Sequence, residues 1–527
     1  MPASRESIDE FLSDLWSDLA PGAARGASEG KPPAGESVRQ SASSAAAPAK
    51  PSPAPTASKQ PQPPQTPQPQ PLQQPPAAAQ SAQPKSPAPK SVPARQAASA
   101  SPPHDPAAFA PRTPRSFREV GVGSEEVSRI ILKLLAARGS VTGRRIATHL
   151  RLPFRLVEAN LNEMRKEHHI SLKGEAIAGD YTYLITEKGL KRAAELSREC
   201  TYFGSVPVPL KQYVDGISRQ SVAGVPVRAK DLNEAFSDLL LDPNLLHKLG
   251  PAINSGRGLF LFGEPGNGKT SIAERVSRSI GTTMWIPRAL GIDGQIIRVF
   301  DPSIHKAVPE GIDGEEELDP TEIDHRWLRI YRPTVIAGGE LTMSELEVSQ
   351  DPGTKICEAP LQLKSNGGVL LIDDFGRQRM PVDELLNRWI VPLEKRYDLL
   401  NLPNGKKVQV PFDQLVIFST NLEPRDLVDD AFLRRIPYKI EVPNPTPQMF
   451  HQLFQIMCKH IGVEYNADAI NYLINEHYMK ADRSPKACHP RDLLLQIRNF
   501  CTFHEKPMAL TKDSIDFAVS CYFSVLS

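Results

Sequence analysis

The sequence predicts a parallel α/β domain followed by a helical domain, and before them a small helix-rich domain and a disordered N-terminal region. Two short apolar runs, 259–262 and 369–372, have the length of buried strands, and each ends at a turn rich in Gly or Asp. Helical periodicity dominates after residue 444. Proline, with 51 of 527 residues, is about twice as frequent as average and is concentrated in the N-terminal region.

Composition excludes several classes of protein. A net charge of +1, with 23% charged and 40% hydrophobic residues, is typical of globular chains. No apolar run reaches the roughly 18 residues of a membrane span, so we expect no membrane insertion. The N-terminus lacks a basic segment followed by an apolar one, and six cysteines without a CxxC pair predict reduced thiols. We therefore expect a cytoplasmic protein.

Residues 1–20 predict an acidic amphipathic helix. Six apolar residues recur at helical spacing and fall on one face: Ile8, Phe11, Leu12, Leu15, Trp16 and Leu19. Because a long linker separates this helix from any core, we interpret it as a docking peptide for a partner's groove; the alternative is a helix packed on its own chain. Residues 21–117, rich in Pro, Ala, Gln and Ser, are expected to form a disordered spacer.

Residues 118–203 again show the apolar periodicity of helices and strands. We expect a helix capped by Ser124 and ending at Gly139, and then the following elements: helices at 142–150 and 155–167, strands at 169–173 and 181–186, and a closing helix at 187–198. This order resembles a winged-helix domain.

Such a domain can bind DNA or protein, and the sequence leaves both open. The cations that would meet DNA phosphates or base edges are Arg144, Arg145, Arg151, Arg155, Arg165 and Lys166. Glu158, Glu163 and Glu167 dilute the basic helix face.

A glycine-rich turn follows the first apolar run. The run leads into GEPGNGKT and then into the helical stretch SIAERVSRSI, so GxxxxGK[ST] stands in the strand–turn–helix setting that phosphate binding requires. Glycines let backbone N–H groups face a phosphate, and the helix directs its positive end at the same anion. We expect Lys269 to reach the β- and γ-phosphates of ATP and Thr270 to bind Mg²⁺. The expected ATP-binding residues of this motif are Gly263, Glu264, Pro265, Gly266, Asn267, Gly268, Lys269, Thr270 and Ser271.

Two carboxylates follow the second apolar run. A strand that stops at Asp373 and Asp374 exposes both acids at the carboxyl edge of a sheet, where ligands bind. We expect Asp373 to hold Mg²⁺ and Asp374 to polarise the attacking water.

The order of these motifs resembles that of AAA+ ATPases of the bacterial type. Asn421, after the strand-like run 415–419, matches the family's sensor 1. Arg434 and Arg435 match the region that supplies an arginine finger to a neighbouring subunit; Arg435 is favoured because it precedes an apolar residue. Arg491, in HPRDLL, matches sensor 2, which touches the γ-phosphate from the helical lid.

The resemblance implies an α/β ATPase core at 251–443 and a helical lid at 444–527, joined to the small domain by a lead-in at 204–250 with a helix near 229–241. Lid helices are expected near 447–461, 467–476, 490–500 and 512–523. The resemblance further implies ATP and Mg²⁺ as cofactors and a homo-oligomeric ring, a hexamer. One departure is Asp374, because the family usually has Glu there.

The stretch from Lys269 to Asp373 is longer than the fold needs. The surplus, near 290–360, holds an acidic stretch, interpreted as a solvated loop, and a hairpin expected to turn at Asp351-Pro352-Gly353. A second hairpin is expected to turn at Asn404-Gly405, and in some AAA+ branches such a hairpin projects into a central pore, where it would present Lys406 and Lys407.

These patterns predict an ATP-hydrolysing motor. It would remodel a protein complex, with residues 1–20 and the winged helix engaging a client or scaffold. The alternatives are a DNA-directed ATPase that reads DNA with the winged helix and a slowly hydrolysing assembly switch.

Overall fold

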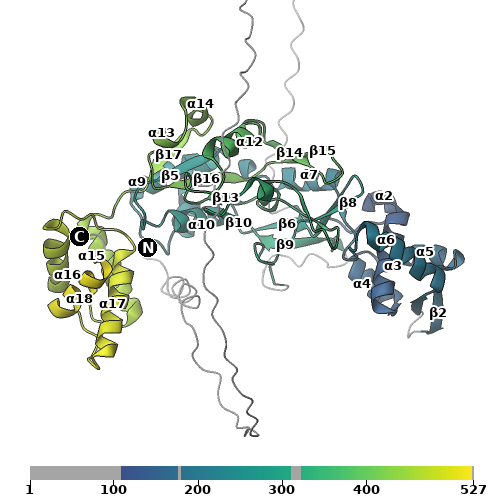
Figure 1. Cartoon of the computed structure of the whole chain (residues 1–527), viewed down its shortest axis with the longest axis horizontal. Coiled ribbons are helices and arrows are strands. Elements are labelled where there is room, and N and C mark those ends of the chain that lie inside the picture. The colour runs from purple at the N-terminus through teal and green to yellow at the C-terminus, as the bar shows by residue number, and fades with distance from the viewer. Residues whose placement is uncertain (1–108, 176–179, 310–321, 525–527) are drawn as a thin grey trace, which may run out of the picture. The chain divides into compact units, whose positions relative to one another are not determined.

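The computed structural model describes residues 109–175, 180–309 and 322–524. The expected helix at 1–20, nearly all of the linker and most of the acidic stretch lie outside the described residues. Within them, every helix is too short or too polar to cross a lipid bilayer. The described residues form a small N-terminal domain, an α/β core with an inserted β region, and a helical lid (Figure 1).

The small domain combines helices with a three-stranded antiparallel sheet of order β1-β3-β2. Its elements are α2 (Phe117–Val120), α3 (Ser124–Arg138), β1 (Ser140–Thr142), α4 (Gly143–Leu150), α5 (Phe154–Lys166), β2 (Ile170–Glu175), β3 (Tyr181–Ile185) and α6 (Glu187–Glu199). The expected helices and the two expected strands are present, and their bounds agree to within about two residues. The sequence pattern does not predict β1, which pairs with β3. Gly123, not Ser124, is the N-cap of α3, so the expected side-chain cap is wrong.

Five parallel strands form the core sheet, in the order β10-β13-β16-β5-β17. They are β10 (Thr334–Ala337), β13 (Val369–Ile372), β16 (Leu415–Thr420), β5 (Leu259–Phe262) and β17 (Tyr438–Glu441). The three central strands are buried along nearly their whole length, which is why they are continuous apolar runs. In register, Ile372 lies opposite Phe418, and Thr420 lies opposite Phe262. Their carboxyl ends therefore share one edge.

Helices cover both faces of this sheet. One face packs against α8 (Ala229–Ala235), α9 (Pro243–Asn254) and α10 (Lys269–Ser279), and the other packs against α12 (Val382–Lys395). The lead-in also contains α7 (Leu210–Arg219). The helix expected near 229–241 is shorter in the structure, because α8 ends at Ala235. Asp242 then caps a separate helix, α9.

The chain between α10 and β10 folds largely into additional β structure, which accounts for the long spacing between the two motifs. β6 (Thr283–Pro287) pairs with β9 (Trp327–Tyr331). A five-stranded sheet has the order β11-β12-β8-β7-β4. Its strands are β11 (Ser349–Gln350), β12 (Cys357–Glu358), β8 (Gln295–Arg298), β7 (Ala289–Ile292) and β4 (Val208–Pro209).

Both expected hairpins are confirmed. β11 pairs with β12 around the expected turn. β14 (Tyr397–Asn401) pairs with β15 (Lys407–Pro411), and Gly405 at the turn has a φ of 81°. At this second tip, Lys406 lies 3.6 Å from Asp293, in the turn between β7 and β8. A projection of the tip into a pore stays a prediction.

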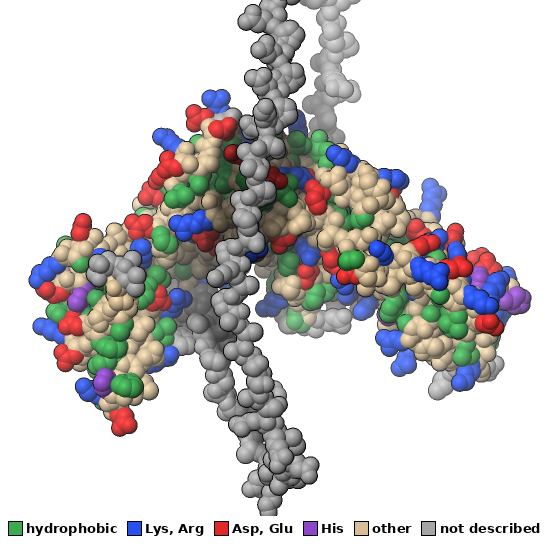
Figure 2. Space-filling model, in the orientation of Figure 1, with side chains coloured by type: hydrophobic (Ala, Val, Ile, Leu, Met, Phe, Trp, Pro, Cys, Tyr) green, Lys and Arg blue, Asp and Glu red, His purple; other side chains and the backbone are tan. Residues whose placement is uncertain are grey.

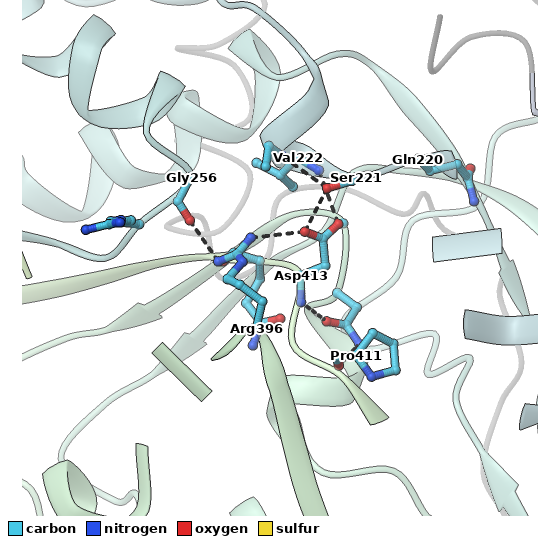
Figure 3. Close-up of polar contacts among 12 residues, drawn as sticks. Gln220, Ser221, Val222, Gly256, Arg396, Pro411 and Asp413 are labelled. Atoms are coloured by element: carbon cyan, nitrogen blue, oxygen red, sulfur yellow. Dashed lines mark hydrogen bonds and ion pairs between the residues drawn. The ribbon is translucent and has the colours of Figure 1, made fainter. Parts of the chain in front are cut away.

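A polar network centred on Asp413 lies at the amino ends of the core strands (Figure 3). Its carboxylate accepts hydrogen bonds from Ser221 Oγ at 2.9 Å, Val222 N at 3.2 Å and Arg396 Nη2 at 3.0 Å. Arg396 also donates to the carbonyl oxygen of Gly256 at 2.7 Å. Because Asp413 precedes β16 and Gly256 precedes β5, this network fastens the lead-in to the sheet edge opposite the two motifs.

The lid has its own apolar core and four helical segments: α15 (Pro447–Ile461), α16 (Ala467–Tyr472) continuing into a π-helical segment (Leu473–Met479), α17 (His489–Phe503) and α18 (Lys512–Tyr522). These confirm the four expected lid helices. The π-helical stretch, in which backbone bonds close one residue later than in an α-helix, has no signature in the sequence pattern.

A buried ion pair in the inserted region reaches the small domain. Arg326 and Asp324 are both nearly inaccessible to solvent, and their side chains approach to 2.7 Å. Arg326 also donates to the carbonyl oxygen of Val120, at the end of α2, at 2.8 Å. The guanidinium of Arg326 thus joins the small domain to the inserted region. Because this charge is buried, it needs both Asp324 and the carbonyl oxygen of Val120.

Residues 109–113 also lie against the inserted region, although the sequence assigns them to the linker. Arg112 forms an antiparallel bridge with Ile323. The ring of Phe109 lies edge-on to Trp327, with centroids 5.8 Å apart. The composition of this segment hides the pairing, because its partner strand is distant in sequence.

We predict that Phe109→Ala lowers the free energy of unfolding by about 1–2 kcal/mol, less than a fully buried Phe would cost. The physical reason is the lost contact with Trp327. Thermal denaturation checks this, with Phe503→Ala as the matched control, because Phe503 is 82% exposed. Equal melting temperatures for the two variants would show that residues 109–113 do not stabilise the fold.

Candidate nucleotide site

The glycine-rich turn connects β5 to α10 through three glycines with positive φ: Gly263 at 132°, Gly266 at 86° and Gly268 at 80°. Side chains rarely tolerate these conformations. At Gly263 a Cβ atom would also approach the carbonyl oxygen of Val442 to 2.5 Å. The turn thus needs glycine for backbone reasons, and α10 begins at Lys269.

Lys269 lies at the centre of the site. Its ammonium donates to the carbonyl oxygens of Gly263 at 2.8 Å and Glu264 at 3.0 Å, and to Asn421 Oδ1 at 2.6 Å. Burial lowers the pKa of Lys269, and the nearby carboxylates act in the opposite direction. The lysine expected to contact phosphate therefore contacts the residue expected to act as sensor 1.

The two acids lie beside the same turn. Thr270 Oγ1 donates to Asp373 Oδ2 at 2.8 Å. Asn421 Nδ2 donates to Asp374 Oδ1 at 3.2 Å. Residues from three strand ends and one helix start are therefore joined by hydrogen bonds, as their order in the sequence predicts.

The oxygen atoms at this point suit Mg²⁺. A hydroxyl and a carboxylate are hard ligands, and Mg²⁺ is commonly bound by one or two carboxylates together with substrate phosphates. Among the described residues no cluster of three or more His, Cys, Asp or Glu side chains forms a metal site. Thr270 and Asp373 would therefore hold the ion only together with nucleotide oxygens.

The backbone at Asp374 favours a short polar side chain. Its φ of 50° lies in the left-handed region. Asp and Asn tolerate this region better than longer side chains do, because their short polar groups bond locally.

The lid contacts the glycine-rich turn directly. Cys488 N donates to Gly266 O at 3.0 Å, and Ala487 N donates to Asn267 Oδ1 at 3.2 Å. Asn267 Nδ2 in turn donates to Asn444 Oδ1 at 2.7 Å. A cavity of about 400 Å³ lies beside these contacts; its lining includes Glu264, Pro265, Arg483, Lys486 and Tyr522. The sequence analysis missed Asn444 and the 486–488 loop, which match no motif.

Arg491 is not brought to the glycine-rich turn. Its Nε donates to Asp492 at 2.9 Å, and within the described residues no hydrogen bond or ion pair joins it to the turn. Ser271, the last expected ATP-binding residue, contributes its carbonyl oxygen to Arg275 on α10.

Arg434 and Arg435 differ in their surroundings. Arg435 Nε lies 2.6 Å from Glu394 Oε1 at the end of α12. Arg434 is exposed, and its side chain forms no hydrogen bond or ion pair with any described residue.

A buried ion pair, also missed by the sequence analysis, joins α10 to the lead-in. Arg275 is fully buried and donates through Nε and Nη2 to Asp238, at 2.9 Å each. Asp238 lies in the lead-in, between α8 and α9. Such a bidentate pair fixes orientation, so the lead-in positions the helix that carries Lys269 and Thr270.

Comparisons with known proteins give distant matches. Residues 446–521 match the family model described as "Domain of unknown function (DUF8689)". The chain is 25% identical over 261 residues to the 26S proteasome regulatory subunit S10B homolog B of Arabidopsis thaliana, covering 48% of this chain and 50% of the relative. It is 26% identical over 174 residues to the proteasome-activating nucleotidase of Methanothermobacter thermautotrophicus, covering 29% and 42%. The chain thus spans half or less of these relatives' length.

Two solved structures are similar in fold. One is NtrX from Brucella abortus, with 14% identity, 54% of this chain and 56% of that chain covered, and a TM-score of 0.35. The other is the RuvB Holliday junction branch migration motor of Thermotoga maritima, with 14% identity, 55% and 73% covered, and a TM-score of 0.30.

We predict that Asp374→Glu lowers the free energy of unfolding by about 1 kcal/mol, because Glu fits the left-handed backbone less well than Asp. Asp374→Asn should leave stability nearly unchanged. Chemical denaturation without nucleotide measures both. Asp383→Glu, on the exposed side of α12, adds the same methylene at an ordinary helical position. A cost at Asp374 no larger than at Asp383 would refute the backbone explanation.

Proposed function

From the premise that this chain contains an AAA+ module, we propose that it binds ATP with Mg²⁺ and hydrolyses it to ADP and phosphate. The observation that carries the proposal is a set of three hydrogen bonds across the strand ends: Lys269–Asn421, Asn421–Asp374 and Thr270–Asp373. These side chains come from separate segments and have the chemistry that phosphoryl transfer to water needs.

Each side chain has a defined role. Lys269 exchanges its carbonyl contacts for the β- and γ-phosphates. Thr270 and Asp373 hold Mg²⁺, which supplies positive charge to the phosphate oxygens when bound. Asp374 accepts a proton from the attacking water, and Asn421 orients that water and the γ-phosphate. Arg491 would exchange its contact with Asp492 for the γ-phosphate.

The site is completed by a neighbouring subunit in a homo-oligomeric ring, a hexamer by family resemblance. We assign the arginine finger to Arg435, with Arg434 as the alternative. The contact of Arg435 with Glu394 does not prevent this role, because a partly exposed ion pair is worth only about 0–1 kcal/mol.

The motor acts on a protein complex in this proposal, with residues 1–20 and the small domain as client or scaffold adaptors. Both curated relatives carry names that refer to the proteasome, itself a protein complex, which supports a protein client over a nucleic acid.

A second candidate function is a DNA-directed ATPase that uses the small domain to bind DNA. Exposed cations favour it: Arg144 and Arg145 on α4, and Arg165 and Lys166 at the end of α5. Arg155 is partly engaged, because its Nη2 donates to the carbonyl oxygen of Arg115 at 2.9 Å. Figure 2 shows Lys and Arg side chains interspersed with Asp and Glu over this domain.

We predict that Lys269→Ala abolishes ATP binding or lowers hydrolysis by orders of magnitude, because it removes the cation that contacts the phosphates. Asp374→Asn should instead retain ATP while hydrolysis stalls, since Asp373 remains to hold Mg²⁺. Nucleotide-binding titration and phosphate release measure the two effects separately. Normal ATP hydrolysis by Lys269→Ala would refute the proposed function. If Asp374→Asn lost ATP affinity as much as hydrolysis, the roles assigned to Asp373 and Asp374 would be wrong.

Mixed oligomers test the finger. Arg435→Ala alone should bind ATP but hydrolyse it slowly, and arginine fingers elsewhere contribute about 10³–10⁵-fold in rate. Mixing Arg435→Ala with Lys269→Ala should restore activity above that of either variant, because some interfaces then combine an intact Lys269 with an intact Arg435. The same mixture with Arg434→Ala is the matched control. Rescue in the control alone would assign the finger to Arg434.

A further inference from the structure

Arg288, between β6 and β7, lacks a carboxylate partner among the described residues. Its Nε atom is shut off from solvent and has no hydrogen-bond partner there, although the side chain as a whole is partly exposed. Its Cζ lies 6.0 Å from the centroid of the Phe300 ring. Burial lowers the pKa of this guanidinium, because its charge is partly removed from water.

Other buried arginines of the described chain are compensated. Three of them meet a carboxylate: Arg275 with Asp238 at 2.9 Å, Arg326 with Asp324 at 2.7 Å and Arg388 with Asp398 at 2.5 Å. Arg332 donates through its Nη atoms to the backbone carbonyl oxygens of Gln220 and Gly367, although its Nε has no partner among the described residues. Arg288 differs from these four arginines because its side chain forms no hydrogen bond with any described residue, and a bound anion would supply the missing acceptor.

A second arginine lies in a segment of the small domain that contacts the strand beside Arg288. Arg151 is the exposed C-cap of α4, in the turn before α5, with a φ of 60°. The preceding residue, Leu150, accepts a hydrogen bond from Val206 N at 3.0 Å, and β4, which follows, pairs with β7 beside Arg288. The charge of Arg151 lowers the pKa of Arg288 further. Two like charges thus lie near this junction, and no ion pair joins either of them to a described carboxylate.

We propose that Arg288 and Arg151 bind a phosphate group of a nucleic-acid backbone at the junction of the small domain and the inserted β region. The inference rests on the second candidate function above. Guanidinium groups match phosphate oxygens with paired N–H donors. A free phosphate needs only one group of cations, whereas the successive phosphates of a strand need several along a surface. Arg144 and Arg145, which are exposed on α4, supply the further positive charges.

The test measures binding of the full chain to a fluorescently labelled DNA duplex of mixed sequence by anisotropy. Salt is varied between about 50 and 200 mM, over which phosphate contacts weaken steeply. Arg288→Gln and Arg151→Gln should each weaken binding by up to about tenfold and reduce the salt slope by about 1.

The matched control is Arg192→Gln. Arg192 is exposed on α6 and already pairs with Glu195 at 2.9 Å, so the variant removes the same charge from a compensated site. Arg288→Gln should melt no lower than the wild type without DNA, because it removes an uncompensated charge. Arg288→Lys, which keeps the charge but not the paired donors, should bind between the wild type and Arg288→Gln.

The outcomes separate the site from the function on which it rests. No duplex binding by the wild type would overturn both the site and the second candidate function. Binding that Arg288→Gln leaves unchanged, or that Arg192→Gln weakens equally, would overturn the site alone. If millimolar inorganic phosphate raises the melting temperature of the wild type but not of Arg288→Gln, and the duplex does not bind, the ligand is a free phosphate and the backbone assignment is wrong.

Discussion

The parallel register of β13, β16 and β5 is the constraint on which the candidate site depends. Because Ile372 lies opposite Phe418 and Thr420 opposite Phe262, the three strands end at one edge of the sheet. The polar side chains that follow these three strands therefore lie close together as a direct result of the strand register. A shift of one residue in any of these strands would turn its side chains to the other face and move its terminal polar groups away from Lys269.

The two edges of the sheet are held by different kinds of interaction. At the carboxyl edge, Asn421 accepts a hydrogen bond from the buried Lys269 and donates one to Asp374. At the amino edge, Asp413 is largely buried and joins the lead-in, β5 and β16 in one network. Buried networks of this kind lose stability when a single partner is removed.

Buried charge also explains how the additions attach to the core. Arg275 with Asp238 holds the lead-in against α10, and Arg326 with Asp324 holds the inserted region against the end of α2. Each pair fixes the orientation of the segments that it joins. Its net contribution to the free energy of unfolding is small, because the cost of removing both charges from water offsets their mutual attraction. Arg288 differs from these pairs, because its side chain has no carboxylate partner among the described residues.

The sequence by itself determined the elements whose signals are local: the glycine-rich turn, the two apolar strands, the hairpins at 351–353 and 404–405, and the lid helices. Turn chemistry and periodicity act over a few residues, so they can be interpreted without the fold. Only the tertiary structure decided that Asp374 has a left-handed backbone, that residues 109–113 pair with the inserted region, that Arg435 meets Glu394 and that Arg288 meets no acid among the described residues. Those facts depend on which distant segments become neighbours, and packing sets this rather than any pattern along the chain.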